Sequence, residues 1–386
     1  MTTHHQSDHR WIFIILLYLC SIYLPLIISR SDTAESFLQG DSFYYRAVLD
    51  SLLNDGDLSL ANNVPTDPLN GQLAMGREGF VPKHPILMPL VSLPFYSLLG
   101  TPGLLLFNIF NSIILILLIF KLNCLFHSRS IAFITTILYA TATLFLDYTY
   151  SYSPDVFSTV LLLGGLYFVL QKSFYAGMVL LGLSIFAKLP NAPLVFTILL
   201  FAGFMIWREH SEQDNSKEQF RHKLAVTVTA IVIFILALVP YAYTNYKLFG
   251  SPIVTGYQRT ATADSAGQML LVDHASKFNQ PLLKGMYISL FDPRNGILPT
   301  NPVVIMALLG VVRLRSIKPR DKAYLILLLC LIQFVLFAKY DEWYMSHFSN
   351  RFLMTFVALS SVFTGSFLSY ISQKYSFHDS LPEEVL

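Results

Sequence analysis

The sequence predicts an all-α, polytopic membrane protein: a bundle of about ten transmembrane helices. Of the 386 residues, 54% are hydrophobic and only 13% are charged, whereas a soluble domain has roughly 45–50% apolar and about 25% charged residues. This amount of charge is too small to cover the surface of a soluble globule. Most side chains must therefore face lipid or other helices. The net charge of +2 and the scattered basic residues exclude a nucleic-acid partner.

Apolar runs divide the chain into expected spans, because a transmembrane helix needs ~20 mostly apolar residues. No small-x-small cleavage signal follows the first run, so it is expected to be a retained helix rather than a signal peptide. The proline-rich stretch 85–99 is expected to lie shallowly before the second span. The expected spans are 11–29, 103–121, 131–147, 155–171, 174–189, 191–207, 224–246, 301–314, 323–338 and 352–371.

The distribution of lysine and arginine predicts the orientation. Short connections on one side are basic, for example 208–223 and 313–322, while those on the other side carry few basic residues. By the positive-inside rule the basic side is cytoplasmic, and so are both termini. The long connections 30–85 and 247–300 then lie outside, as loops of a single integral-membrane domain, 1–386. Long loops without repeats are usually functional, which directs the search for chemistry to them.

The first outside loop begins and ends with candidate site residues. Asp41 starts a segment, 40–53, whose apolar spacing predicts an amphipathic helix lying on the membrane. It could be a helix N-cap, a catalytic group, or both. The loop closes with Lys83 and His84 between two prolines, which restrict the backbone. A rigid cation at this depth suits a lipid phosphate, although a lysine that only anchors the helix end remains an alternative.

The centres of the expected spans contain no Asp, Glu, Lys or Arg. Ion-coupled transporters usually need ionisable groups inside the membrane, and many secondary transporters show an internal repeat, which this chain lacks. Both observations weigh against a transporter and favour a site at the outer interface.

The order of these motifs resembles the GT-C superfamily of integral-membrane glycosyltransferases. A first span is followed by Gly-Asp at 40–41, Tyr-Tyr at 44–45, Gly-Asp at 56–57 and Lys-His-Pro at 83–85. The pattern is most similar to the bacterial lipid-A aminoarabinose transferase and protein O-mannosyltransferase types. Those families have Lys-Pro-Pro or His-Pro-Pro where this chain has Lys-His-Pro, a departure that keeps the cation.

The resemblance is good over residues 1 to about 200 and weak after 285. In the later part, 291–298 followed by Asn301-Pro302, and 343–351 with its tryptophan, serines and Arg351, resemble elements of bacterial members. Residues 152–155 more loosely resemble the place of a second acidic residue. No soluble outer domain is expected, unlike in larger members.

The resemblance implies transfer of a sugar from a polyprenyl phosphate to an acceptor hydroxyl on the outer face, with inversion, in a bacterial inner membrane. A phosphate leaves as a stable anion, so the enzyme needs one base and cations to receive the charge. Asp41 matches the base. Asp155 could position the acceptor or cap its helix, and Arg351 could be only an interfacial anchor. The residues expected at the donor phosphate are Lys83, His84, Arg294 and Arg351.

The expected partners are the polyprenyl-phosphate sugar, a glycan, lipid or protein acceptor, and membrane lipid. No cofactor is predicted, and no metal, because Asp41 and Asp155 alone make a poor octahedral site. Two alternatives remain: a lipid or polysaccharide transporter or flippase, and a noncatalytic scaffold. The scaffold would be favoured if Asp41 and Lys83 lay far apart.

Overall fold

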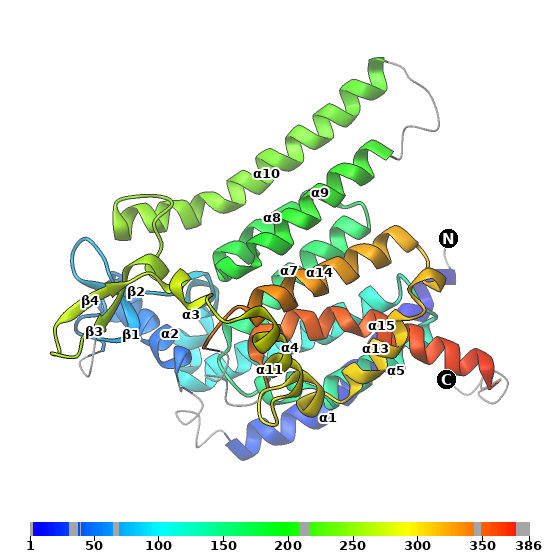
Figure 1. Cartoon of the computed structure of the whole chain (residues 1–386), viewed down its shortest axis with the longest axis horizontal. Coiled ribbons are helices and arrows are strands. Elements are labelled where there is room, and N and C mark those ends of the chain that lie inside the picture. Colours follow the sequence, from blue (N-terminus) through cyan, green and yellow to red (C-terminus); the bar gives the residue numbers. More distant parts are fainter. Residues whose placement is uncertain are drawn as a thin grey trace.

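The computed structural model describes residues 3–30, 38, 40–64, 69–208, 217–342 and 349–375. Its long helices run roughly alongside one another, and a small sheet and short helices gather at one end (Figure 1). The helices are α1 (Thr3–Arg30), α2 (Asp41–Asp50), α3 (Leu87–Leu99), α4 (Thr101–Asn123), α5 (Arg129–Thr141), α6 (Leu144–Tyr148), α7 (Pro154–Leu170), α8 (Phe174–Ala187), α9 (Ala192–Arg208), α10 (Lys217–Phe249), α11 (Leu282–Phe291), α12 (Ile297–Thr300), α13 (Val303–Val311), α14 (Arg320–Ala338) and α15 (Met354–Lys374).

The predicted helical membrane fold is confirmed, and the number of spans stays a prediction. Five of the described helices are long and apolar enough to cross a bilayer: Thr101–Asn123, Leu189–Arg208, Lys217–Phe249, Arg320–Ala338 and Arg351–Lys374. Most of the other expected spans correspond to shorter apolar helices such as α7 and α8. The expected span 301–314 contains only the nine-residue α13, which begins after Pro302.

Helices α4, α5, α7, α13, α14 and α15 enclose the main hydrophobic core. Side chains such as Ile119, Leu166 and Val357 are fully buried in it. Helix α10 packs along α8 and, less extensively, against α9, and it forms the outer edge of the bundle (Figure 1). Its outward face is apolar, with Leu236 61% exposed. A face of this composition is suited to lipid, in keeping with the membrane assignment.

A four-stranded antiparallel sheet joins the two long connections. Strands β1 (Asn70–Met75) and β2 (Phe80–Pro82) come from the first connection, and β3 (Thr260–Ala263) and β4 (Met269–Val272) from the second. The strand order is β2-β1-β3-β4, so β1 and β3 pair across the gap between the loops. The sequence reasoning expected no sheet here, because each strand has only three to six residues.

The predicted amphipathic helix of the first loop is α2, which continues into a π-helical turn, Ser51–Asp55. Its buried face, including Tyr45, Val48 and Leu49, shares a second apolar cluster with Leu73 of β1 and Met88 of α3. This packing fixes α2 on the end of the bundle, with Asp41 at its first turn.

Candidate active site

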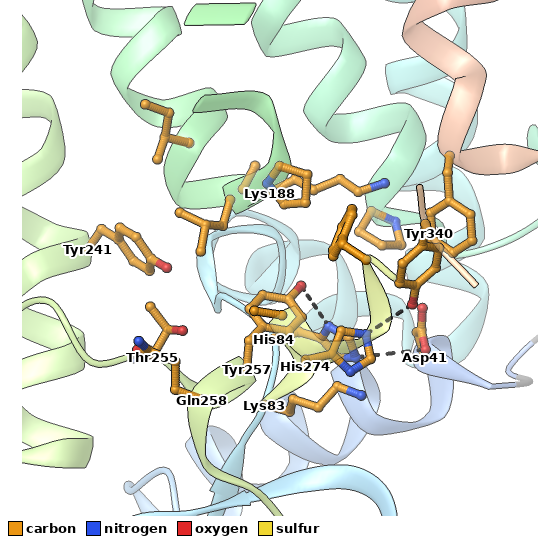
Figure 2. A pocket seen from close by; sticks show the side chains of 18 of the residues that line it. Asp41, Lys83, His84, Lys188, Tyr241, Thr255, Tyr257, Gln258, His274 and Tyr340 are labelled. Carbon is orange, nitrogen blue, oxygen red and sulfur yellow. Dashed lines mark hydrogen bonds and ion pairs between the residues drawn. The ribbon is translucent and has the colours of Figure 1, made fainter. Parts of the chain in front are cut away.

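A cavity of about 710 Å³ lies where the sheet and α2 meet the bundle. Figure 2 shows its polar end, where side chains from the two long connections face residues at the ends of the helices. The charged side chains lining it are Asp41, Lys83, Asp155, Lys188, Asp273, Glu342 and Arg351, and the histidines are His84 and His274. Five of the six predicted site residues therefore line one cavity, and Arg294 does not.

Asp41 is held by an ion pair rather than by helix capping. Gly40 occupies the cap position of α2, without a side-chain cap bond. Arg351 Nη2 donates to Asp41 Oδ2 at 2.7 Å, and His84 Nε2 lies 3.8 Å from Asp41 Oδ1. Burial alone would raise the pKa of Asp41, but Arg351, His84 and Lys83 outweigh it and hold the pKa well below its usual range. Asp41 is therefore an ionised carboxylate.

Arg351 also connects Asp41 to the second acidic residue. Its Nε lies 3.7 Å from Asp155 Oδ2, and Lys188 Nζ forms an ion pair with Asp155 Oδ1. The four side chains thus alternate in charge across the wall of the cavity. Ser153 accepts a hydrogen bond from Asp155 N and so supplies the helix cap of α7, which leaves the Asp155 carboxylate directed to its cations.

The backbone that presents Arg351 is fixed in an uncommon conformation. Ser349 has φ of 53°, in the left-handed region that residues other than glycine seldom adopt. Asn301 Nδ2 donates to Ser349 Oγ at 2.9 Å, while Asn301 Oδ1 accepts from Leu144 N at 2.7 Å. Asn350 then caps the turn that begins at Arg351. Such strain persists only where the surroundings impose it, and here it sets the direction of the guanidinium.

Lys83 is 6% exposed, and its Nζ donates to Gly71 O at 2.7 Å. Burial lowers the pKa of Lys83, while Asp41 acts in the opposite direction. Its backbone lies directly against Gly256, where an added Cβ would come within 2.3 Å of Lys83 O. A glycine is therefore required at 256 for the second connection to close over the Lys83 segment.

His84 is neutral and faces Asp41. Burial lowers the pKa of His84 to about 3, against the opposing effect of Asp41. Its Nδ1 lies 3.0 Å from the Tyr257 hydroxyl, as the dashed line in Figure 2 marks. Its Nε2 is buried without a hydrogen-bond partner. Among the described residues its nearest charged neighbour is Asp41, so His84 is placed to act on that carboxylate.

A second polar group adjoins the first. His274 Nε2 lies 3.0 Å from the Tyr340 hydroxyl, which donates to Glu342 Oε2 at 3.0 Å. Lys277 Nζ lies 2.9 Å from Glu342 Oε1. Burial would raise the pKa of Glu342, but the hydrogen bonds from Lys277 and Tyr340, together with the charges of His274 and Lys277, outweigh it and lower the pKa. Among the described residues, no three His, Cys, Asp or Glu side chains are grouped as a metal site requires.

The rest of the cavity is mainly apolar, with a few uncharged polar side chains such as Asn245 and Gln258. It extends from the charged end between α8, the start of α9, and α10. No charged side chain interrupts this part, so it suits a hydrocarbon chain. Its apolar lining includes Ile185, Leu189, Pro190, Pro193, Leu238 and Ala242.

Arg294 lies outside the cavity lining. Its side chain is exposed, its backbone N bonds to Asp292 Oδ1 at 3.0 Å, and its carbonyl accepts from Ser349 N at 3.3 Å. The Arg294 segment therefore supports the turn before Arg351. A role of the Arg294 side chain at the donor phosphate stays a prediction.

Sequence reasoning missed Lys188, Tyr257 and His274. Lys188 had one detectable signal: it is a lysine at the predicted outer end of a span, opposite Asp155. The other two lie in the second connection, 247–300, where the surrounding residues carry no motif. Trp343 and Ser346, which belonged to the resemblance near Arg351, lie outside the described residues.

Comparisons with known proteins agree with this architecture. Residues 83–241 match the family model described as dolichyl-phosphate-mannose-protein mannosyltransferase. No curated protein matches the chain.

Solved structures share the fold. ArnT from Cupriavidus metallidurans bound to undecaprenyl phosphate is 12% identical, with a TM-score of 0.59 over 91% of this chain and 61% of ArnT. The Archaeoglobus fulgidus oligosaccharyltransferase in the apo form is 13% identical, with a TM-score of 0.62 over 97% of this chain and 52% of that one. The oligosaccharyltransferase AglB from the same organism, in complex with an inhibitory peptide and a dolichol-phosphate, is 12% identical. Its TM-score is 0.50 over 89% of this chain and 47% of AglB.

The chain thus spans 61% or less of the length of these proteins. The shared fold and the family model matched over residues 83–241 confirm the resemblance to the GT-C superfamily of membrane glycosyltransferases that was stated from the sequence.

Proposed function

We propose that this chain transfers a sugar from a polyprenyl-phosphate donor to an acceptor hydroxyl on the outer face of a bacterial inner membrane, inverting the anomeric centre, with Asp41 as general base. The observation that carries the proposal is the convergence of Asp41, Lys83 and Arg351 on one cavity whose remainder is mainly apolar. A noncatalytic scaffold has no use for this convergence.

The reaction needs little from the protein besides a base and cations. The acceptor oxygen attacks C1 of the sugar, the bond between C1 and the phosphate oxygen breaks, and the electron pair leaves with the phosphate. Asp41 takes the proton of the acceptor hydroxyl. The departing phosphate is a stable anion, so it needs no proton, unlike the leaving group in glycoside hydrolysis.

The ion pair between Asp41 and Arg351 suggests how the base becomes active. A carboxylate whose pKa lies well below its usual range is a weak base. A donor phosphate beside Arg351 would share its positive charge, and the pKa of Asp41 would then rise because burial favours the neutral acid. Donor binding would thus strengthen the base only when a substrate is present.

The cations in the cavity indicate where the donor phosphate would bind. His84 Nε2 and the Lys188 ammonium both line the cavity, with Arg351 between Asp41 and Asp155. The isoprenoid would follow the apolar part beside α10. One solved structure with this fold binds undecaprenyl phosphate and another binds dolichol-phosphate, which supports a lipid-phosphate donor. We propose no metal.

The deciding experiment compares the purified wild type, Asp41→Asn and Asp55→Asn in sugar transfer from a panel of polyprenyl-phosphate sugars. Asp55 is an exposed carboxylate of the same loop, so its variant controls for the loss of a charge. We expect Asp41→Asn to lower the rate by about 10²–10⁴-fold, the usual contribution of a general base, and Asp55→Asn to retain activity. Because no metal is proposed, a chelator should leave the wild-type rate unchanged.

Thermal unfolding should show that Asp41→Asn remains folded. Equal activity in Asp41→Asn and wild type would remove Asp41 from the chemistry. If the wild type transferred no sugar from any donor but moved lipid across the bilayer of vesicles, the transporter would be supported instead.

A further inference from the structure

A second cavity, of about 280 Å³, lies at the other end of α15 from the Asp41 site. Three segments form it: the loop after α4, the turn after α13, and the last turns of α15. The lining residues are Phe126, His127, Ser128, Ile131, Arg313, Ser316, Ile317, Ser366, Ser369, Tyr370, Ser372 and Gln373.

This cavity is separate from the proposed active site. The two share no lining residue. Arg351 lines the first cavity just before α15 begins, and Tyr370 lines the second near its end; a helix rises 1.5 Å per residue, so the two are roughly 30 Å apart along the axis. Figure 1 shows α15 running from the middle of the bundle to the C-terminal end of the described chain.

Hydroxyl groups without partners line the second cavity. Ser366 is 6% exposed, and its hydroxyl makes no hydrogen bond to any described residue. The hydroxyls of Ser316, which is exposed, and of Ser372, which is half-buried, also make no hydrogen bond to a described residue. Ser128 begins α5 but makes no side-chain cap bond. A buried hydroxyl normally finds a partner, so Ser366, together with the more accessible serines around it, is suited to a polar ligand.

The charge of the described lining is positive. Arg313 stacks on Tyr370, with its guanidinium carbon 4.1 Å from the ring centroid. No acidic side chain of the described chain lines the cavity or pairs with Arg313. Burial lowers the pKa of His127 to about 4, although its bond to the Val362 carbonyl opposes this, so His127 adds no charge. Arg313 keeps the donors at the edge of its guanidinium for a bidentate contact with two oxygens of an anion.

The N-terminus of α5 faces the same space through Ser128 and Ile131. The first backbone N–H groups of a helix have no partner within the helix, and they attract anions. The helix end alone would not define a site. Combined with the buried Ser366 hydroxyl and the unpaired edge of Arg313, it completes a set of donors on three sides.

We propose that this cavity binds a phosphate group, with Arg313 as the cation and Ser128, Ser316, Ser366 and Ser372 as hydroxyl donors. The group can belong to an anionic lipid headgroup of the adjacent leaflet or to free phosphate. The site is independent of the proposed sugar transfer.

The test measures binding to the full-length protein in detergent, with phosphatidylglycerol, phosphate-free diacylglycerol and inorganic phosphate as probes, by native mass spectrometry and calorimetry. Arg313→Gln and Ser366→Ala should each weaken binding of phosphatidylglycerol or phosphate, by about tenfold for Arg313→Gln. Arg315→Gln is the matched control, since Arg315 is exposed and outside the lining. Ser366→Ala keeps the test valid if Arg313→Gln fails to fold.

Each outcome decides the proposal. Binding that depends on Arg313 and Ser366 but not on Arg315 supports it, and the probe that binds shows whether the source is lipid or free phosphate. Equal losses in Arg313→Gln and Arg315→Gln would reveal only general surface charge. The proposal would be overturned if diacylglycerol bound with the same affinity as phosphatidylglycerol. It would also be overturned if neither phosphatidylglycerol nor inorganic phosphate bound. Binding that appears only when residues 376–386, which include Asp379, Glu383 and Glu384, are removed would overturn it as well.

Discussion

His84 makes the folded protein sensitive to mild acid. Its pKa is about 3 in the folded state, against about 6.5 for an unperturbed histidine. Below pH ~6.5 the unfolded chain therefore binds a proton that the folded chain resists. The stability contributed by neutral His84 is fully present above pH ~6.5 and is lost as the pH falls toward ~3. Asp41 loses its contribution only below the unfolded aspartate pKa of ~3.9.

We therefore expect His84→Gln to reduce the acid sensitivity of unfolding. Between about pH 6.5 and about pH 4.5, wild type should lose up to about 1.4 kcal/mol per pH unit more than the variant. Thermal unfolding in detergent across this range measures the difference. His222→Gln, at an exposed position of α10, is the control. Parallel pH profiles for wild type and His84→Gln would contradict a neutral, buried His84.

The individual residues of the cavity were predictable where a local pattern marked them. Asp41 and Lys83 lie in motifs, and Asp155 follows a proline at a helix start, so each was singled out from the sequence. Tyr257 and His274 were not, because they enter the cavity only through pairing between distant segments. Nor could the sequence show that Arg351 binds both acidic groups, since that depends on the turn fixed by Ser349.

The sheet is the element on which the shape of the site depends. Strand β3 pairs with β1 on one side and β4 on the other, and Ala263 N donates to Leu69 O at 3.0 Å. The sheet holds the Lys83 end of the first connection against the Tyr257 segment. Its strands are too short to give a clear alternating pattern, so the sequence predicted the helices of the bundle but not the element that joins its loops.

Ala263→Pro should disturb the site from a distance. Proline has no N–H, so the bond to Leu69 is lost and the sheet is weakened at a central strand. We expect a marked fall in sugar transfer and a lower unfolding temperature. Ser265→Pro is the matched control in the adjacent turn, where Gly267 N bonds to Asp264 O and the second position favours proline. Similar losses in both variants would show that the hairpin as a whole, not its pairing with β1, matters.

Over the whole molecule, the two cavities lie toward opposite ends of α15, and the charge pattern predicts that these ends lie on opposite sides of the membrane. The apolar runs were sufficient to predict the class of fold, because lipid imposes length and composition on a helix. They did not set the boundaries, since proline residues and short breaks shorten runs such as 301–314, in which α13 covers only nine residues.

Labelling of single cysteines would test the orientation. In a variant without Cys20, Cys124 and Cys330, Ser265→Cys should react with a membrane-impermeant maleimide on intact cells. Gln373→Cys should react only after permeabilisation. Both positions are exposed, so access from the solvent is not limited by burial. Labelling of both from the same side would exclude the predicted topology with the active site outside and the C-terminus inside.

The pairing of β1 with β3 also sets a schedule for biosynthesis. Asn70 pairs with Thr262, so at roughly 5–20 residues per second the first loop emerges roughly 10–40 s before its partner strand exists. During that time helices α3 to α10 are synthesised while the edge of β1 has no strand beside it. Arg351, the partner of Asp41, follows later still. A chain whose synthesis stops before the last helix would thus have most of its apolar helices but would lack Arg351, so its charge network could not assemble.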